Sequence, residues 1–158
     1  MDIDQQLEQL IAEAPTERGM PKVMEAAIAP ILKAIAQKLQ HENYYILQNT
    51  EEKWQVTTLR HRQDHNLEKR VVYGFPTLED AGTFAQHNDD PDLMALPIPV
   101  THILFELLAF EQVDSVIFFD QSGNYENGID IPREKLQESI REKLKQLKKQ
   151  AKQSQNLA

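Results

Sequence analysis

The chain has 158 residues, of which 41% are hydrophobic and 27% are charged, and this is enough for one globular domain with its own core. It contains no cysteine, which excludes disulfides, thiolate zinc sites and a cysteine nucleophile. No apolar run approaches the ~18 residues that a membrane span needs. The N-terminus, MDIDQQLEQL, lacks an apolar signal region. We therefore expect a cytoplasmic protein with no membrane partner.

The net charge of −8 is distributed unevenly along the chain. Residues 141–158 contain six Lys or Arg and one acid and so carry +5, which leaves −13 on the rest. An acidic body repels phosphates, so we expect no nucleic-acid partner. The basic segment is either a solvated helix end, where the helix dipole favours lysine, or a docking element for an acidic partner. In the second case the protein would be a regulatory subunit bound through its C-terminal helix.

The first forty residues predict two helices. A short helix is expected over residues 2–13, because apolar residues recur there at helical spacing, at Ile3, Leu7, Leu10 and Ile11. The stretch APTERGMP interrupts this pattern, so residues 1–19 should form a short helix and a linker. A longer helix begins near Pro21, a residue type that suits the first turn. Pro30 should kink that helix near Ala26, because proline lacks the backbone donor.

The pattern then changes to the alternation that is typical of strands. Three segments are rich in aromatic and β-branched residues, namely YYILQ (44–48), WQVTTL (54–59) and RVVYGF (70–75). The link NTEEK is short enough for a hairpin, whereas the link HRQDHNLEK is longer and polar. We therefore predict three antiparallel strands in a meander.

Helix and strand alternate after this meander. We first predict a helix, LEDAGTFAQ, that is capped by Thr77. A buried strand (93–99), an apolar helix (99–110) and a further strand (113–119) follow. After a turn at Asn127-Gly128, the last helix begins at Pro132. The apolar stripe of the last helix ends at Leu147, so residues 148–158 should be a polar, basic tail that frays. The predicted fold class is α/β (α+β). It is one domain over residues 20–147, with the meander followed by βα units and with helices packed on the sheet.

The stretch HNDDPD, residues 87–92, looks reactive because it combines His87 with three aspartates. A calcium loop would need more oxygen ligands and a glycine, and a zinc site would need three or four converging donors. Asn and Asp are common turn formers, and Pro91 forces the preceding residue out of the helical conformation. We interpret the stretch as a loop without a metal. The alternative is a metal-dependent or acid–base enzyme that uses His87, Asp89, Asp90 and Asp92.

Other candidates for chemistry are weaker. His61 and His65 have helical spacing, but they lie between predicted strands and lack an HExxH pattern. His102 and Glu106 share the apolar helix and form either an acid–base pair or a structural one. The chain has no G-x-S-x-G elbow, and its five glycines form no phosphate-binding loop. We therefore predict no catalytic residue and no cofactor.

Aromatic residues on or near the predicted strands favour binding over catalysis. They are Tyr44, Tyr45, Trp54, Tyr73, Phe75, Phe118, Phe119 and Tyr125. Either all of them are core, or some emerge beside the helix 99–110 and form a groove for a peptide. We predict a protein-binding site at Tyr45, Trp54, Tyr73, Leu104 and Phe110. An apolar helix of this kind also suits a dimer interface, so a homo-oligomer is the other interpretation of residues 99–110.

Two family resemblances add to these predictions. The order of FPTLEDAGTFA, ALPIPVTHILFELL, VDSVIFF and GIDIPREKL, over roughly residues 70–145, resembles the serine-sensitivity enhancing protein family. That resemblance implies a small α/β domain without known catalytic residues. The segments YYILQNTEEKWQVTTL, VVYGFPTLEDA and LPIPVTHILF resemble the carboxysome assembly factors of cyanobacteria, which bind the C-terminal extension of a shell protein. This second resemblance implies a non-enzymatic adaptor in photosynthetic carbon dioxide fixation, with a carboxysome shell protein as its partner and no metal or cofactor.

Overall fold

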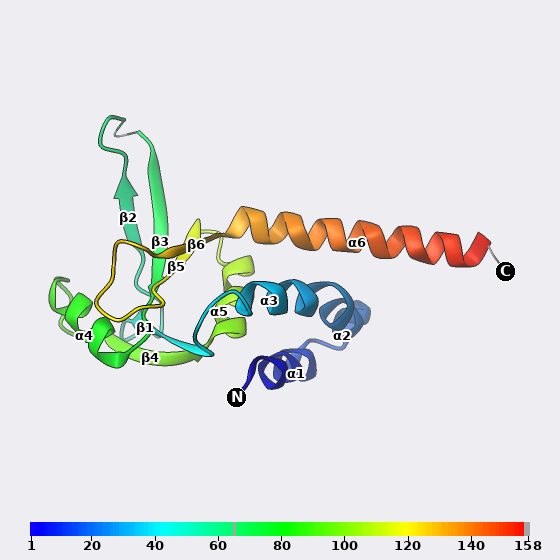
Figure 1. Ribbon diagram of the computed structural model, residues 1–158, viewed down its shortest axis with the longest axis horizontal. Coiled ribbons are helices and arrows are strands. Elements are labelled where there is room, and N and C mark those ends of the chain that lie inside the picture. Colours follow the sequence, from blue (N-terminus) through cyan, green and yellow to red (C-terminus); the bar gives the residue numbers. More distant parts are fainter. Residues whose placement is uncertain (65, 157–158) are drawn as a thin grey trace.

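Two small sheets and a group of helices build this chain (Figure 1). The computed structural model describes residues 1–64 and 66–156. One sheet pairs β1 (Asn43–Gln48) with β4 (Met94–Pro99), and the other has the strand order β2-β3-β5-β6. The predicted mixed α/β class is confirmed for the described residues.

The first helix, α1 (Ile3–Glu13), begins at a reciprocal cap. The Asp2 carboxylate accepts the backbone N–H of Gln5 at 2.8 Å, and the Gln5 side chain accepts the N–H of Asp2 at 3.0 Å. Two of the N–H groups that lack an intrahelical partner are satisfied in this way. The short predicted helix over residues 2–13 is therefore confirmed.

The second predicted helix is interrupted by a wide turn. Its segments are η1 (Glu17–Gly19), α2 (Met20–Val23), the π-helical turn η2 (Met24–Ile28) and α3 (Ala29–Ala36). The N–H of Ala29 bonds the carbonyl of Met24, five residues back. The wide turn comes directly before Pro30, which has no N–H to offer the carbonyl of Ala26. The irregularity expected near Ala26 is therefore present, and its cause is the missing donor.

Helix α5 (Val100–Ala109) lies at the centre of the packing. It contacts α1, α3 and α6, and Figure 1 shows α6 running across the helical group. Its inward face is fully buried and consists of Val100, Thr101, Ile103, Leu104 and Leu107. Helix α5 therefore joins the N-terminal helices to the rest of the core.

The four-stranded sheet mixes parallel and antiparallel pairs. Its strands are β2 (Thr57–Arg60), β3 (Glu68–Gly74), β5 (Ser115–Phe118) and β6 (Ile129–Pro132). Strand β3 pairs antiparallel with β2 and parallel with β5, and β5 pairs antiparallel with β6. A parallel pair needs a long crossover connection. Here the crossover contains α4 (Leu78–Gln86), β4 and α5.

The predicted three-stranded meander is not confirmed. Strands β2 and β3 pair as predicted, but β1 pairs along its whole length with β4, from Asn43 opposite Pro99 to Gln48 opposite Met94. Between β1 and the following strand there is one isolated bridge, Gln48 with Trp54. The turn at NTEEK does form, since the Asn49 side chain accepts two backbone N–H groups within it. Beyond that turn the same edge of β1 bonds the end of β3 instead, because Tyr45 and Phe75 exchange two backbone hydrogen bonds, at 2.8 and 3.0 Å.

Helix α6 (Arg133–Asn156) extends beyond the body of the protein. Leu136 and Ile140 are buried, but residues 148–154 are exposed, and Figure 1 shows the last turns continuing past α2. We expected a frayed tail after Leu147, whereas the helix continues to Asn156. Lysine, glutamine and alanine are good helix formers, and no Pro or Gly interrupts them. Within the described residues, no helix combines the length and the apolarity that crossing a membrane requires.

Candidate functional site

The structure distributes the five predicted binding residues over three places. The rings of Trp54 and Phe110 stack, with their centroids 6.2 Å apart. Tyr45 and Tyr73 pack on a second apolar cluster, away from that pair. Leu104 is 0% exposed and belongs to the main core. Of the five, Trp54 and Phe110 come together beside α5, and we leave Leu104 out of the site.

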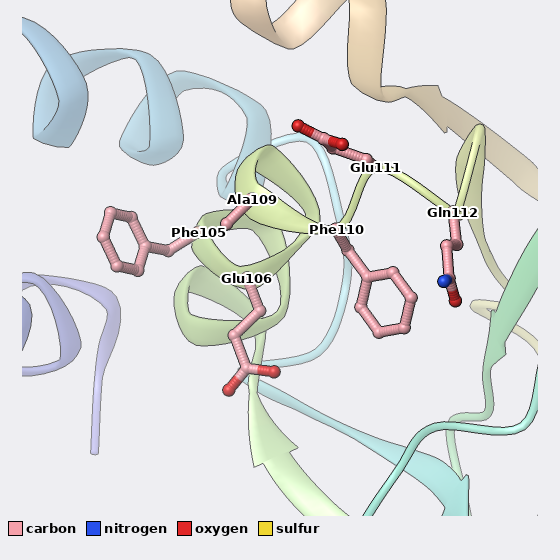
Figure 2. Close-up of a pocket in the computed structure, with 6 residues that line it drawn as sticks. All are labelled: Phe105, Glu106, Ala109, Phe110, Glu111 and Gln112. Atoms are coloured by element: carbon pink, nitrogen blue, oxygen red, sulfur yellow. The ribbon is translucent and has the colours of Figure 1, made fainter.

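Two adjoining hollows lie on the outward face of α5, and we call them together the α5 groove. The first has a volume of about 500 Å³ and is lined by Phe105, Glu106, Ala109, Phe110, Glu111 and Gln112. The second has a volume of about 270 Å³ and is lined by Leu10, Glu13, Ala14, Pro15, Met24, His102, Phe105 and Glu106. The hollows share Phe105 and Glu106. Figure 2 shows Phe105 and Phe110 leaving α5 on opposite sides, with Glu106 between them.

Local structure explains why these side chains face outward. Helix α5 buries Ile103, Leu104 and Leu107, so residues half a turn away must face the solvent. Phe110 ends the helix, and its ring rests on Trp54, which is buried behind it. Phe105 was not among the predicted binding residues, and Glu106 was considered only as a partner of His102, because the helix was expected to be apolar on all sides. Helical spacing relative to the buried leucines is the signal that would have found them.

The α5 groove is negatively charged. Its described lining contains Glu13, Glu106 and Glu111 and includes no lysine or arginine. Desolvation raises the pKa of Glu106, and the nearby charge of His102 opposes this rise. The His102 ring nitrogen Nε2 lies 3.4 Å from the backbone carbonyl of Gln6. Apolar side chains beside carboxylates make a surface suited to an apolar segment that carries positive charge.

The stretch HNDDPD is a loop, as predicted. The backbone N–H of His87 and the Asn88 side chain both donate to the carbonyl of Phe84, at 3.1 Å each, which ends α4. The Asp90 side chain accepts the backbone N–H of Asp92 at 2.9 Å. These polar groups therefore form turns. Across residues 1–64 and 66–156, no group of three or more His, Asp or Glu side chains is placed to hold a metal ion.

Of the histidines His61 and His65, the structure describes His61. His61 Nδ1 accepts the backbone N–H groups of Gln63 at 3.2 Å and Asp64 at 3.3 Å, so this side chain organises the turn between β2 and β3. His65 lies outside the described residues. The geometry around His61 is that of a turn-forming side chain.

Sequence comparison assigns no family to the chain. Against models of known protein families and against curated protein sequences, it has no match. The resemblance to the carboxysome assembly factors therefore stays a prediction.

Proposed function

We propose that this protein is a non-enzymatic adaptor that binds an apolar, positively charged segment of another protein in the α5 groove. The observation that carries this proposal is the outward face of α5. There, Phe105 and Phe110 flank Glu106 over two joined hollows. Catalysis is less well supported, because the reactive-looking side chains of HNDDPD form turns.

The shape and the chemistry of the groove favour a peptide. Binding energy in interfaces concentrates in a few aromatic and apolar anchors that a partner can cover. Phe105 and Phe110 are each partly buried, so they have fixed positions and still offer ring surface. A hollow of about 500 Å³ is within the range of about 300–1,000 Å³ that is typical of ligand-binding pockets, so it has room for apolar side chains of a bound segment.

The charge of the groove narrows the class of partner. Glu13, Glu106 and Glu111 would attract a segment containing lysine or arginine and would repel an acidic one. We propose the C-terminal extension of a carboxysome shell protein as the first partner to test, on the resemblance to the carboxysome assembly factors. In this proposal the adaptor works in the cytoplasm, at the assembling carboxysome.

The experiment titrates the protein with peptides from the C-terminal extension of a carboxysome shell protein, called tail peptides below, and measures tryptophan fluorescence. Trp54 is the only tryptophan of the chain, and it stacks on Phe110 at the edge of the groove. We expect a saturable change in its emission. In Glu106→Lys, we expect the affinity to fall about tenfold because like charges then face each other. Glu138→Lys is the matched control, since Glu138 is an exposed glutamate on α6 outside the groove.

Two results would contradict the α5 groove as the binding site. One is a tail peptide that binds Glu106→Lys and Glu138→Lys with the same affinity. The other is saturable binding, detected by calorimetry, that leaves Trp54 emission unchanged and survives Phe105→Ser in the folded protein.

A second candidate is docking through the end of α6. The observation that favours it is the exposed helical segment 148–154, which carries Lys148, Lys149 and Lys152. An acidic partner would contact these lysines without touching the core. Deleting residues 148–158 separates the candidates, because it removes this surface and leaves the α5 groove unchanged.

A further inference from the structure

A further hollow lies beside the four-stranded sheet, away from the residues of the α5 groove, and we call it the aromatic pocket. Its volume is about 370 Å³. It is lined by Tyr73, Phe84, Ile117, Phe119, Tyr125, Glu126, Gly128 and Asp130. None of these residues lines the α5 groove.

Four aromatic rings meet in this pocket, Tyr73 from β3, Phe84 from α4, and Phe119 and Tyr125 from the connection between β5 and β6. Tyr73 and Phe119 lie nearly parallel, with centroids 5.5 Å apart and an angle of 23° between their planes. Phe84 stands at 63° to Tyr73, at 5.1 Å, and Tyr125 stands at 86° to Phe119, at 5.4 Å. The planes of these rings are therefore turned in different directions, and all four rings line one hollow.

The ring of Tyr125 is held in place although it is 44% exposed. Its hydroxyl donates to the Asp80 carboxylate at 2.8 Å. Asp80, which is 4% exposed, also accepts the backbone N–H of Gly123 at 3.0 Å and the hydroxyl of Thr77 at 2.6 Å. Burial, this hydrogen bond and the negative charges of Asp80 and Glu79 raise the pKa of Tyr125, so its hydroxyl stays protonated and keeps donating.

Gly128 packs closely against the pocket lining, where a side chain would not fit. A Cβ at this position would come within 2.4 Å of Ile117 Cγ2 and 3.0 Å of the Phe119 ring. The backbone therefore lies directly against the lining.

The mouth of the pocket is acidic. Glu126 and Asp130 line it, and the charges of Glu79 and Asp80 act on Tyr125 at its edge. Lys69 forms an ion pair with Asp130, which offsets one of these carboxylates. The remaining carboxylates leave a negative potential over the ring faces, which are themselves negative.

From this geometry we propose that the aromatic pocket binds a substituted ammonium ion, the group present in alkylated lysine and in choline-like small molecules. Several ring faces around one cation attract it through their quadrupoles, and the carboxylates at the mouth add to this attraction. An alkylated ammonium ion loses less hydration on entering such a site than a compact one does. This binding site goes beyond the proposed adaptor function, because it shares no residue with the α5 groove.

The first test compares choline with 3,3-dimethylbutanol, the uncharged compound of the same shape, by calorimetry and by NMR of the tyrosine rings. We expect saturable binding of choline and at least about tenfold weaker binding of the alcohol. Equal affinity for the two compounds would overturn the proposal, because a merely apolar pocket does not distinguish them. No saturable binding of choline or of a trimethyl-lysine peptide would also overturn it.

Variants test the residues themselves. Tyr125→Leu and Glu126→Gln should each weaken choline binding. The expected loss is about fivefold for Tyr125→Leu, which removes one ring face. Tyr125→Phe keeps the ring and should bind better than Tyr125→Leu. Glu106→Gln, in the α5 groove, is the control and should leave choline affinity unchanged. Wild-type affinity in folded Tyr125→Leu and Glu126→Gln contradicts the site.

A trimethyl-lysine peptide identifies the source of the cation. Affinity at least about tenfold above that of choline supports a modified protein chain as the source, and equal affinity supports a free small molecule. Both results support the pocket. The proposed adaptor function fails separately, because shell-tail binding depends on Glu106 and choline binding depends on Tyr125.

Discussion

The side-chain oxygen of Gln6 accepts two hydrogen bonds from Thr101, one from its backbone N–H at 3.1 Å and one from its hydroxyl at 2.8 Å. Both residues are fully buried. Thr101 lies in the first turn of α5, where N–H groups lack intrahelical partners, and Pro99 before it offers no side-chain cap. A glutamine on α1 therefore caps α5 from a different helix. The Gln6 amide nitrogen also donates to the carbonyl of Glu42 at 2.8 Å, which ties in the start of β1.

We predict that Gln6→Leu destabilises the protein by about 3 kcal/mol, because it leaves buried groups of Thr101 and a carbonyl without partners. Urea unfolding measures this loss. Gln9→Leu is the matched control on the same helix. Gln9 makes an exposed hydrogen bond to Glu13, so Gln9→Leu should lower the free energy of unfolding by less than about 1 kcal/mol. Equal losses for the two variants would show that Gln6 does not act as the cap of α5.

Ionisation of the Asp80 carboxyl group should make the stability of the folded protein depend on pH in the acid range. Burial opposes its charge, but hydrogen bonds from Thr77, Ser122, Tyr125 and the N–H of Gly123 outweigh this and lower its pKa from the ordinary 3.8. The folded state therefore favours the charged carboxylate more than the unfolded state does. The resulting stability is present above pH 3.8 and is lost as the pH falls through the lower folded pKa.

The measurement is urea unfolding of wild type and Asp80→Asn between pH 7 and pH 2. We expect the largest stability difference at neutral pH and a shrinking difference below about pH 4. A difference that stays constant over this range would mean that ionisation of Asp80 contributes nothing.

Gly128→Ala should both destabilise the protein and narrow the aromatic pocket. The new Cβ would approach Ile117 Cγ2 to 2.4 Å, and overpacking of this kind costs about 1–3 kcal/mol. Gly82→Ala is the control, because apart from its chain neighbours and the backbone of α4 nothing lies within 4 Å of a Cβ built on Gly82. It should stabilise α4 by about 0.5–1 kcal/mol. Thermal unfolding compares the two, and a stabilised Gly128→Ala would contradict the close packing.

Removing residues 148–158 should leave the stability within about 0.5 kcal/mol of the full chain, because residues 148–154 are exposed. Chemical unfolding and a titration with the shell tail are the measurements. If the α5 groove is the binding site, the affinity of the tail is unchanged. Loss of binding with unchanged stability would instead favour docking through α6.

Local signals account for much of the secondary structure. The predicted cap at Thr77 is present, since its hydroxyl accepts the N–H of Asp80 at 3.1 Å and opens α4. The apolar helix predicted over residues 99–110 is α5, and the wide turn before Pro30 follows from its missing donor. Each of these features depends on residues within one or two helical turns, and so the sequence contains the whole cause.

The residues of the candidate sites could be predicted from the sequence only in part. Trp54 and Phe110 were predicted and do meet, but Leu104 faces the core while its neighbour Phe105 faces out. One residue along a helix rotates a side chain by about 100°. Which face is buried depends on what packs against the helix. Tyr125 lies in the connection after β5, and its place beside Phe119 follows from the hydrogen bond to Asp80.

By itself the sequence determined the mixed α/β class, the helix boundaries near caps and prolines, the loop at HNDDPD, and the division into an acidic body and a basic C-terminal helix. Tertiary structure alone decided that β1 pairs with β4 and that α5 turns Phe105 and Glu106 outward. It also decided that four rings from β3, α4 and the connection after β5 share one pocket. The reason is physical. Caps and turns are satisfied by neighbouring residues, whereas strand pairing and side-chain burial are chosen by packing between distant segments.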